Sequence, residues 1–155
     1  MELFAKLTEI YKNYETRVET ADGTNYFIIA NPFWNEDIRV TDEDGIIFFF
    51  SYQHAHFDCG NDLNESIEDL TEYINAFIDG NLVAIEFLSG ETNLFGGSRN
   101  LDDIDTSSGK TLLKSFAGDN KSLYKALCDQ VKGFDCCCLI RGWNNANNKD
   151  IDFVL

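Results

Sequence analysis

Apolar residues recur at steps of three and four over residues 63–79, and this spacing predicts a helix with one buried face. Asp62 and Glu65 stand three apart, as in a capping box. Gly80 can adopt the left-handed conformation that commonly ends a helix. The apolar face consists of Leu63, Ile67, Leu70, Ile74, Phe77 and Ile78. Similar spacing predicts further helices over residues 2–14 and 121–132 and a short one around 110–116.

Extended segments alternate with these helices. Asp22-Gly23 separates residues 16–21 from 25–30, and an Asp-Gly pair supplies the positive φ that a tight hairpin turn requires. Asp42 to Gly45 marks a second hairpin. The predicted strands cover residues 16–21, 25–30, 38–41, 46–52, 82–88, 93–95, 134–141 and 150–155, and the polar stretch 96–109 is expected to be a loop.

This order of elements predicts an α+β fold with an antiparallel or mixed sheet and about three helices packed on it. A length of 155 residues favours a single domain, 1–155, and a 44% share of hydrophobic residues is enough for a packed core. The N-terminus lacks the basic and apolar segments of a signal peptide, and no apolar run is long enough to span a bilayer. We therefore expect a cytoplasmic protein.

The five cysteines do not indicate a disulfide framework, because their number is odd and three of them, Cys136 to Cys138, are consecutive. In a strand, Cys136 and Cys138 point to one face and Cys137 to the other. We expect them to act as small buried apolar residues.

Acidic residues dominate the middle of the chain. Between Arg39 and Arg99 there are twelve Asp and Glu residues and no Lys or Arg. Residues 1–105 hold 5 basic and 22 acidic residues, a charge of −17, and residues 106–155 hold 7 and 5, a charge of +2, which together give −15. The electrostatic field of this negative region repels nucleic acid and anionic membranes and speeds the encounter with a cationic partner.

Two acidic groups are candidate partner-binding residues. Glu65, Glu68, Asp69 and Glu72 fall on the outer face of helix 63–79, and Asp102, Asp103 and Asp105 fall in the polar stretch. Charged outer faces are often merely solvated and add solubility. The absence of any basic residue across the middle favours a binding surface instead. Exposed aromatic residues near the charges, such as Trp34, Tyr52 or Trp143, would supply affinity.

His54, His56 and Asp58 form an alternative site. If the strand that begins at Ile46 continues, the three side chains share one face, and two imidazoles with a carboxylate suit zinc or iron(II). No other histidine is present, so an acid or cysteine from elsewhere would have to complete the site. Hydrogen bonds between strand-end histidines and nearby carboxylates explain the same residues. The alternative function is a small metal-dependent enzyme or metal sensor.

Other motifs fail at defining positions. Ser108-Gly109-Lys110-Thr111 ends like a phosphate-binding loop, but the required earlier glycine is Ile104, so a helix N-cap at Thr106, Ser107 or Ser108 is the better interpretation. Asp103, Asp105 and Ser107 have calcium-loop spacing, yet the twelfth position is Lys114 instead of glutamate. Cys59 lies near His56, but its acidic surroundings would blunt a thiolate nucleophile. We find no catalytic signature and expect no cofactor.

In size, charge and expected architecture the whole chain resembles the immunity proteins of bacterial toxin systems, which are small, acidic α+β domains that neutralise basic toxins, many of them nucleases. No motif matches residue by residue, so the resemblance transfers no binding residues. It implies a basic protein partner, such as a cognate toxin, that is blocked by a charge-complementary surface. A structural module that pairs through residues 151–155 as an edge strand is a third possibility, and the sequence leaves the oligomeric state open.

Overall fold

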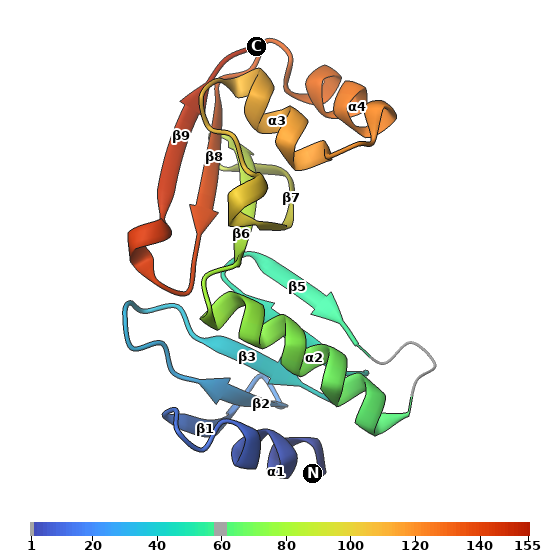
Figure 1. Cartoon of the computed structure of the whole chain (residues 1–155), viewed down its shortest axis with the longest axis vertical. Coiled ribbons are helices and arrows are strands. Elements are labelled where there is room, and N and C mark those ends of the chain that lie inside the picture. The colour runs from blue at the N-terminus through green and yellow to red at the C-terminus, as the bar shows by residue number, and fades with distance from the viewer. Residues whose placement is uncertain (1, 58–61) are drawn as a thin grey trace. The chain divides into compact units, whose positions relative to one another are not determined.

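The computed structural model describes residues 2–57 and 62–155, and it confirms the α+β class. All paired strands are antiparallel, and they form two sheets where one was expected. The chain divides into two compact units, residues 1–78 and 79–155, each with its own sheet and helices (Figure 1). The single cooperative domain expected from the length stays a prediction.

Unit 1 (residues 1–78) is a five-stranded meander with two helices. Its strands follow one another in space as they do in sequence, from β1 at one edge to β5 at the other. The elements are α1 (Glu2–Ile10), β1 (Thr16–Ala21), β2 (Thr24–Ile29), β3 (Ile38–Thr41), β4 (Ile47–Phe50), β5 (Gln53–His56) and α2 (Leu63–Ile78).

The first predicted hairpin is confirmed. Asp22 and Gly23 form a two-residue turn, and both have the positive φ (51° and 83°) that keeps the flanking strands twisted correctly. The strand predicted over 46–52 ends earlier than expected, at Phe50. Ser51 adopts a φ of 54° and reverses the chain, so that His54 and His56 lie on a separate edge strand, β5.

The core of unit 1 lies between one face of its sheet and the two helices. Phe48 of β4 packs on Phe77 of α2, with ring centroids 5.3 Å apart, and Phe4 of α1 packs on Phe27 of β2 at 6.0 Å. All four side chains are buried. α2 therefore covers the sheet near β4, and α1 covers it near β2.

Unit 2 (residues 79–155) is a four-stranded antiparallel sheet with the order β7-β6-β8-β9. Two helices, α3 and α4, cover one face and enclose a core that includes Val83, Ile85, Leu113 and Val131. The elements are β6 (Leu82–Ser89), β7 (Thr92–Asn100), the 3-10 turn η1 (Leu101–Asp103), α3 (Gly109–Ala117), α4 (Lys121–Val131), β8 (Cys136–Arg141), the 3-10 turn η2 (Asn145–Asn147) and β9 (Lys149–Phe153).

The predicted loop over 96–109 begins later than expected, because β7 continues to Asn100. Gly97 lies in this strand under the ring of Phe116, where a Cβ atom would sit 3.4 Å from the ring and 3.1 Å from Arg99 Nη1. A glycine therefore serves close packing at this point rather than a turn.

The cysteines of β8 alternate as predicted: Cys136 and Cys138 are buried in the core, and Cys137 is half-buried on the opposite face. Burial raises the pKa of the Cys138 thiol to about 12. Within the described parts of the chain, no helix combines the length and apolarity needed to cross a membrane.

Gly109 gives a direct test of the packing in unit 2. It opens α3, and an alanine methyl there would lie 2.6 Å from Cδ2 and 2.9 Å from Cγ of Phe153 in β9. We expect Gly109→Ala to lower the free energy of unfolding by about 1–3 kcal/mol through overpacking, even though alanine favours helix. In a Phe153→Ala background the methyl has room, so urea titrations should show no further loss. An equal cost in both backgrounds would contradict this explanation.

Candidate functional site

The position of the acidic face of α2 is set by the residues that begin and end the helix and by its buried apolar stripe. Asp62 begins the helix, because its carboxylate accepts a hydrogen bond from the Glu65 N–H at 3.0 Å, and Gly80 follows the last turn with a φ of 79°. Ile67, Leu70, Ile74 and Phe77 are buried against the sheet. This packing fixes the rotation of the helix and turns Glu65, Glu68, Asp69 and Glu72 to solvent, as predicted.

No basic side chain neutralises this face within the described residues. The exposed positions of α2 are occupied by its four carboxylates and by Asn64 and Asn75. Lys6 of the neighbouring α1 donates to Asn64 Oδ1 at 2.7 Å and pairs with Glu2 at 3.2 Å. Lys12 pairs with Glu9 at 2.7 Å. Lys6 therefore meets α2 at the uncharged Asn64, and the ion pairs of both lysines are with acids of α1.

The net negative charge is concentrated in unit 1. Unit 1 holds 4 basic and 16 acidic residues, a formal charge of −12, whereas unit 2 holds 8 and 11, a charge of −3. Four-fifths of the net charge of −15 therefore belongs to the unit that carries the α2 face.

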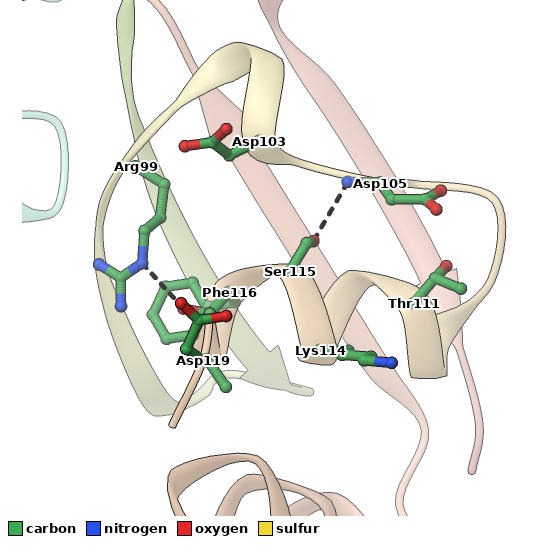
Figure 2. A pocket seen from close by; sticks show the side chains of 10 residues that line it. Arg99, Asp103, Asp105, Thr111, Lys114, Ser115, Phe116 and Asp119 are labelled. Carbon is green, nitrogen blue, oxygen red and sulfur yellow. Dashed lines mark hydrogen bonds between the residues drawn. The ribbon is translucent and has the colours of Figure 1, made fainter. Parts of the chain in front are cut away.

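The second predicted group belongs to unit 2. Asp102, Asp103 and Asp105 are all exposed, in and just after η1. Asp103 and Asp105 line a cavity of about 690 Å³ beside α3, whereas Asp102 does not (Figure 2). A third acid, Asp119 from the link between α3 and α4, also lines it. No sequence signal pointed to Asp119, because only the folding of the chain brings residues 103 and 119 to one cavity.

The cavity is nearly balanced in charge. Arg99 and Lys114 line it together with the three acids. The Arg99 guanidinium lies 4.1 Å from the centroid of the Phe116 ring, and its Nε donates to the Phe116 carbonyl at 2.8 Å (Figure 2). This cavity is thus less suited than the α2 face to a strongly basic partner.

Asp105 is held by its own loop. Its carboxylate accepts the Ser107 N–H at 2.9 Å. Its own N–H donates to Ser115 Oγ at 3.1 Å (Figure 2). The side chain and then the backbone of Ser107 hold the pKa of Asp105 below its ordinary value. The residue remains ionised, but part of its hydrogen-bonding capacity serves the loop.

The three aromatic residues proposed as anchors differ in exposure. Tyr52, in the turn between β4 and β5, is 62% exposed and is available to a partner. Trp34 is half-buried and contacts the Phe50 ring edge-on at 6.2 Å. Trp143 is only 2% exposed, so it cannot serve as a surface anchor.

The two histidines of the alternative site lie side by side. His54 and His56 are exposed on β5, with ring centroids 5.4 Å apart. Asp58 lies outside the described residues, as does Cys59. Within residues 2–57 and 62–155, no group of three or more His, Cys, Asp or Glu side chains is arranged to hold a metal ion. The metal site that includes Asp58 stays a hypothesis.

The motif at residues 108–111 is a helix cap. Ser108 Oγ accepts the Thr111 N–H at 3.2 Å, and Thr111 Oγ1 accepts the Ser108 N–H at 2.9 Å, which completes a capping box at the start of α3. This agrees with the N-cap interpretation of the sequence.

Comparisons with known proteins give no match: no protein-family model fits the chain, and neither a curated protein nor a solved structure is similar to it. The function is therefore inferred from the residues described above.

Proposed function

We propose that this chain is a protein-binding inhibitor of the immunity type, which neutralises a basic toxin in the cytoplasm by covering its cationic active surface. A nuclease is a suitable target, because an enzyme that binds nucleic acid presents a basic cleft. The α2 face would contribute Glu65, Glu68, Asp69 and Glu72, and Asp102, Asp103 and Asp105 would provide a secondary contact.

The unneutralised carboxylate face of α2 carries this proposal. Four exposed carboxylates at helical spacing repel one another, and such pairs cost a few tenths of a kcal/mol each. A basic partner surface would relieve that repulsion, and this relief would contribute favourably to the free energy of binding. The charge of −12 on unit 1 would also speed the encounter with a cationic partner.

Tyr52 is the best-placed aromatic contact for such a partner. It lies two residues after Phe50, whose ring is 5.2 Å from that of Phe77 in the last turn of α2. The turn that carries the exposed Tyr52 therefore follows a strand end that packs against the C-terminal end of α2. A large aromatic residue beside charges is a common source of interface affinity, while the charges themselves govern association rate and specificity.

Partner capture from a lysate of the source organism is the first test. The purified chain serves as bait, and bound proteins are eluted with a salt gradient, because screening weakens a charge-driven complex. We expect one basic protein released at high salt, whose toxic activity the chain then inhibits in a direct assay. A captured protein of acidic charge, or a basic one whose activity is unaffected, would contradict the proposal.

Charge reversal on α2 locates the interface. The variant Glu68→Lys with Glu72→Lys should weaken binding to the captured partner at least about a hundredfold, because like charges placed together at an interface cost several kcal/mol. The matched control, Glu91→Lys with Asp129→Lys, makes the same change in net charge at exposed sites of unit 2. Equal losses in both variants would mean that only the overall field matters and that α2 is not the interface.

A further inference from the structure

The first strand of unit 1 has an open edge. Among the described strands, β1 pairs only with β2, and five of its six residues are exposed. The Glu15 carbonyl accepts the Ala30 N–H at 2.9 Å, so the backbone groups of alternate residues from Glu15 onward face β2. Those of Thr16, Val18 and Thr20 consequently face away from the sheet, where they can pair with another strand.

The sequence of β1 is complementary to itself. Thr16-Arg17-Val18-Glu19-Thr20 is symmetric about Val18, with threonine at both ends and opposite charges on the two sides of the valine. In an antiparallel pair of two copies centred on Val18, Arg17 of each copy lies opposite Glu19 of the other. We propose that this protein self-associates through β1, which pairs with β1 of a second copy in this register. Self-association through β1 does not depend on the proposed function.

The backbone agrees with the same register. Val18 would oppose Val18 of the second copy, and Thr16 would oppose Thr20, so the residues with outward-facing backbone groups meet as hydrogen-bonded pairs. Arg17 and Glu19 would then occupy the non-hydrogen-bonded positions, where cross-strand side chains approach most closely. One two-fold axis thus satisfies both the open hydrogen bonds and the charges.

Charge selects this register over its neighbours. Sliding the antiparallel pair by one step of two residues brings Arg17 against Arg17, or Glu19 against Glu19, and like charges directly opposite are destabilising. An in-register parallel pair also places like charges side by side. A charged edge usually prevents strand addition, but here the order of the charges prevents only the wrong pairings.

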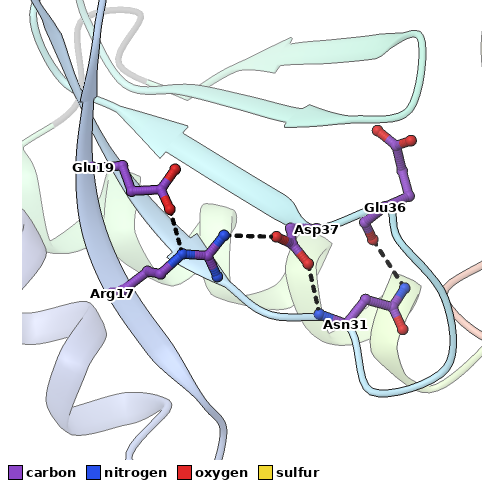
Figure 3. Close-up of polar contacts among 5 residues, drawn as sticks. All are labelled: Arg17, Glu19, Asn31, Glu36 and Asp37. Atoms are coloured by element: carbon purple, nitrogen blue, oxygen red, sulfur yellow. Dashed lines mark hydrogen bonds and ion pairs between the residues drawn. The ribbon is translucent and has the colours of Figure 1, made fainter.

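The charged pair is already ordered in the single chain. Arg17 Nε donates to Glu19 Oε1 at 2.6 Å, and Nη2 donates to Asp37 Oδ2 at 3.0 Å (Figure 3). Asp37 in turn accepts the Asn31 N–H at 2.9 Å. The loop before β3 thus holds the guanidinium over the sheet, so less side-chain freedom is lost when Glu19 of a second copy approaches.

The opposite face of β1 carries an exposed apolar side chain, and two more lie at and just after the end of α1. Val18 is 52% exposed and shares the face of its partner Phe27, on which α1 packs. Ile10 at the end of α1 and Tyr14 just after it are 44% and 39% exposed. A two-fold axis through the Val18 pair places the two α1 helices on the same side of the joined sheet and brings the two exposed Val18 side chains together.

The test is sedimentation velocity with the full chain across a concentration series. We expect the wild-type mass to rise from 17.6 kDa toward twice that value. Arg17→Glu and Glu19→Arg should each raise the dimer dissociation constant about tenfold or more, because the two-fold interface contains the altered contact twice. An equimolar mixture of the two variants should associate again as a heterodimer. In that heterodimer, positions 17 and 19 are both acidic in one chain and both basic in the other, so each cross-strand pair again joins opposite charges.

Val18→Pro is the second variant. It removes an N–H that faces away from β2, so the β1–β2 ladder is preserved while pairing with a second copy is blocked. It should remain monomeric alone and in every mixture. The proposal is overturned by a wild-type chain that stays monomeric, by single charge variants that associate like the wild type, or by a mixture that does not recover. Association unaffected by all β1 variants would overturn it as well and assign the contact to another edge, such as β9.

Discussion

Replacing Phe77 with alanine should lower the free energy of unfolding of unit 1 by about 3–5 kcal/mol, the range for phenylalanine truncation in a packed core. Phe77 is completely buried, and its ring centroid lies 5.3 Å from that of Phe48, 5.2 Å from Phe50 and 5.4 Å from Tyr73. The truncation leaves a cavity at the junction of α2 and β4, which the rigid aromatic neighbours cannot fill by small shifts. The same packing orients the acidic face, so partner binding should weaken as well.

Urea titration followed by tryptophan fluorescence measures this loss. In a Trp143→Phe background, Trp34 is the only indole and reports on unit 1, because it contacts Phe50 in the same core. Phe33→Ala is the matched control: its side chain is 50% exposed, so the same truncation should cost less than about 1 kcal/mol. If Phe77→Ala cost no more than Phe33→Ala, the packing described for α2 would be wrong.

The same titration tests the single-domain prediction. A Trp34→Phe background leaves Trp143 as the reporter for unit 2. Coincident transitions for the two reporters would indicate one cooperative domain, whereas separate transitions would show that residues 1–78 and 79–155 unfold independently.

Helices were predicted well from the sequence because their signals are local, although α1 ends at Ile10 and not at the predicted residue 14. The stripe, the capping residue and the terminal glycine of α2 are close together along the chain, and the predicted range 63–79 extends only one residue past the observed end at Ile78. The hairpin at Ser51 and Tyr52 was missed for the opposite reason. Serine is a common turn residue, but neither position holds the glycine, asparagine or aspartate that usually adopts a positive φ, and the left-handed conformation of Ser51 is imposed by the pairing of β4 with β5.

The candidate site was predictable only in part. Helical periodicity is sufficient to place Glu65, Glu68, Asp69 and Glu72 on the exposed face. Two other features depend on contacts between residues far apart in sequence: the burial of Trp143, and the cavity that joins Asp103 and Asp105 to Asp119. No local pattern encodes either of them.

Raising the pH should destabilise the protein through Cys138. Burial, followed by the nearby Cys137, raises the pKa of this thiol from 9.0 to about 12. Below pH 9 the thiol is protonated in both states, so the full stability is present. Between pH 9 and 12 the unfolded chain loses the proton more readily than the folded one, and the free energy of unfolding falls by about 1.4 kcal/mol per pH unit. The total loss from this one group reaches about 4 kcal/mol at pH 12.

Urea titrations from about pH 8 to about pH 11 with a reductant present would measure this slope. Cys138→Ala removes the titrating group, so its stability should decline with pH less steeply than that of the wild type, by about 1.4 kcal/mol per unit. Burial raises the pKa values of Cys136 and Tyr11 in the same direction, so the variant should keep a smaller slope of the same sign. Ile140→Val is the control, because it loosens the same strand without removing a thiol and should retain the wild-type slope. Parallel pH profiles for the wild type and Cys138→Ala would show that the Cys138 thiol is not held protonated by the core of unit 2.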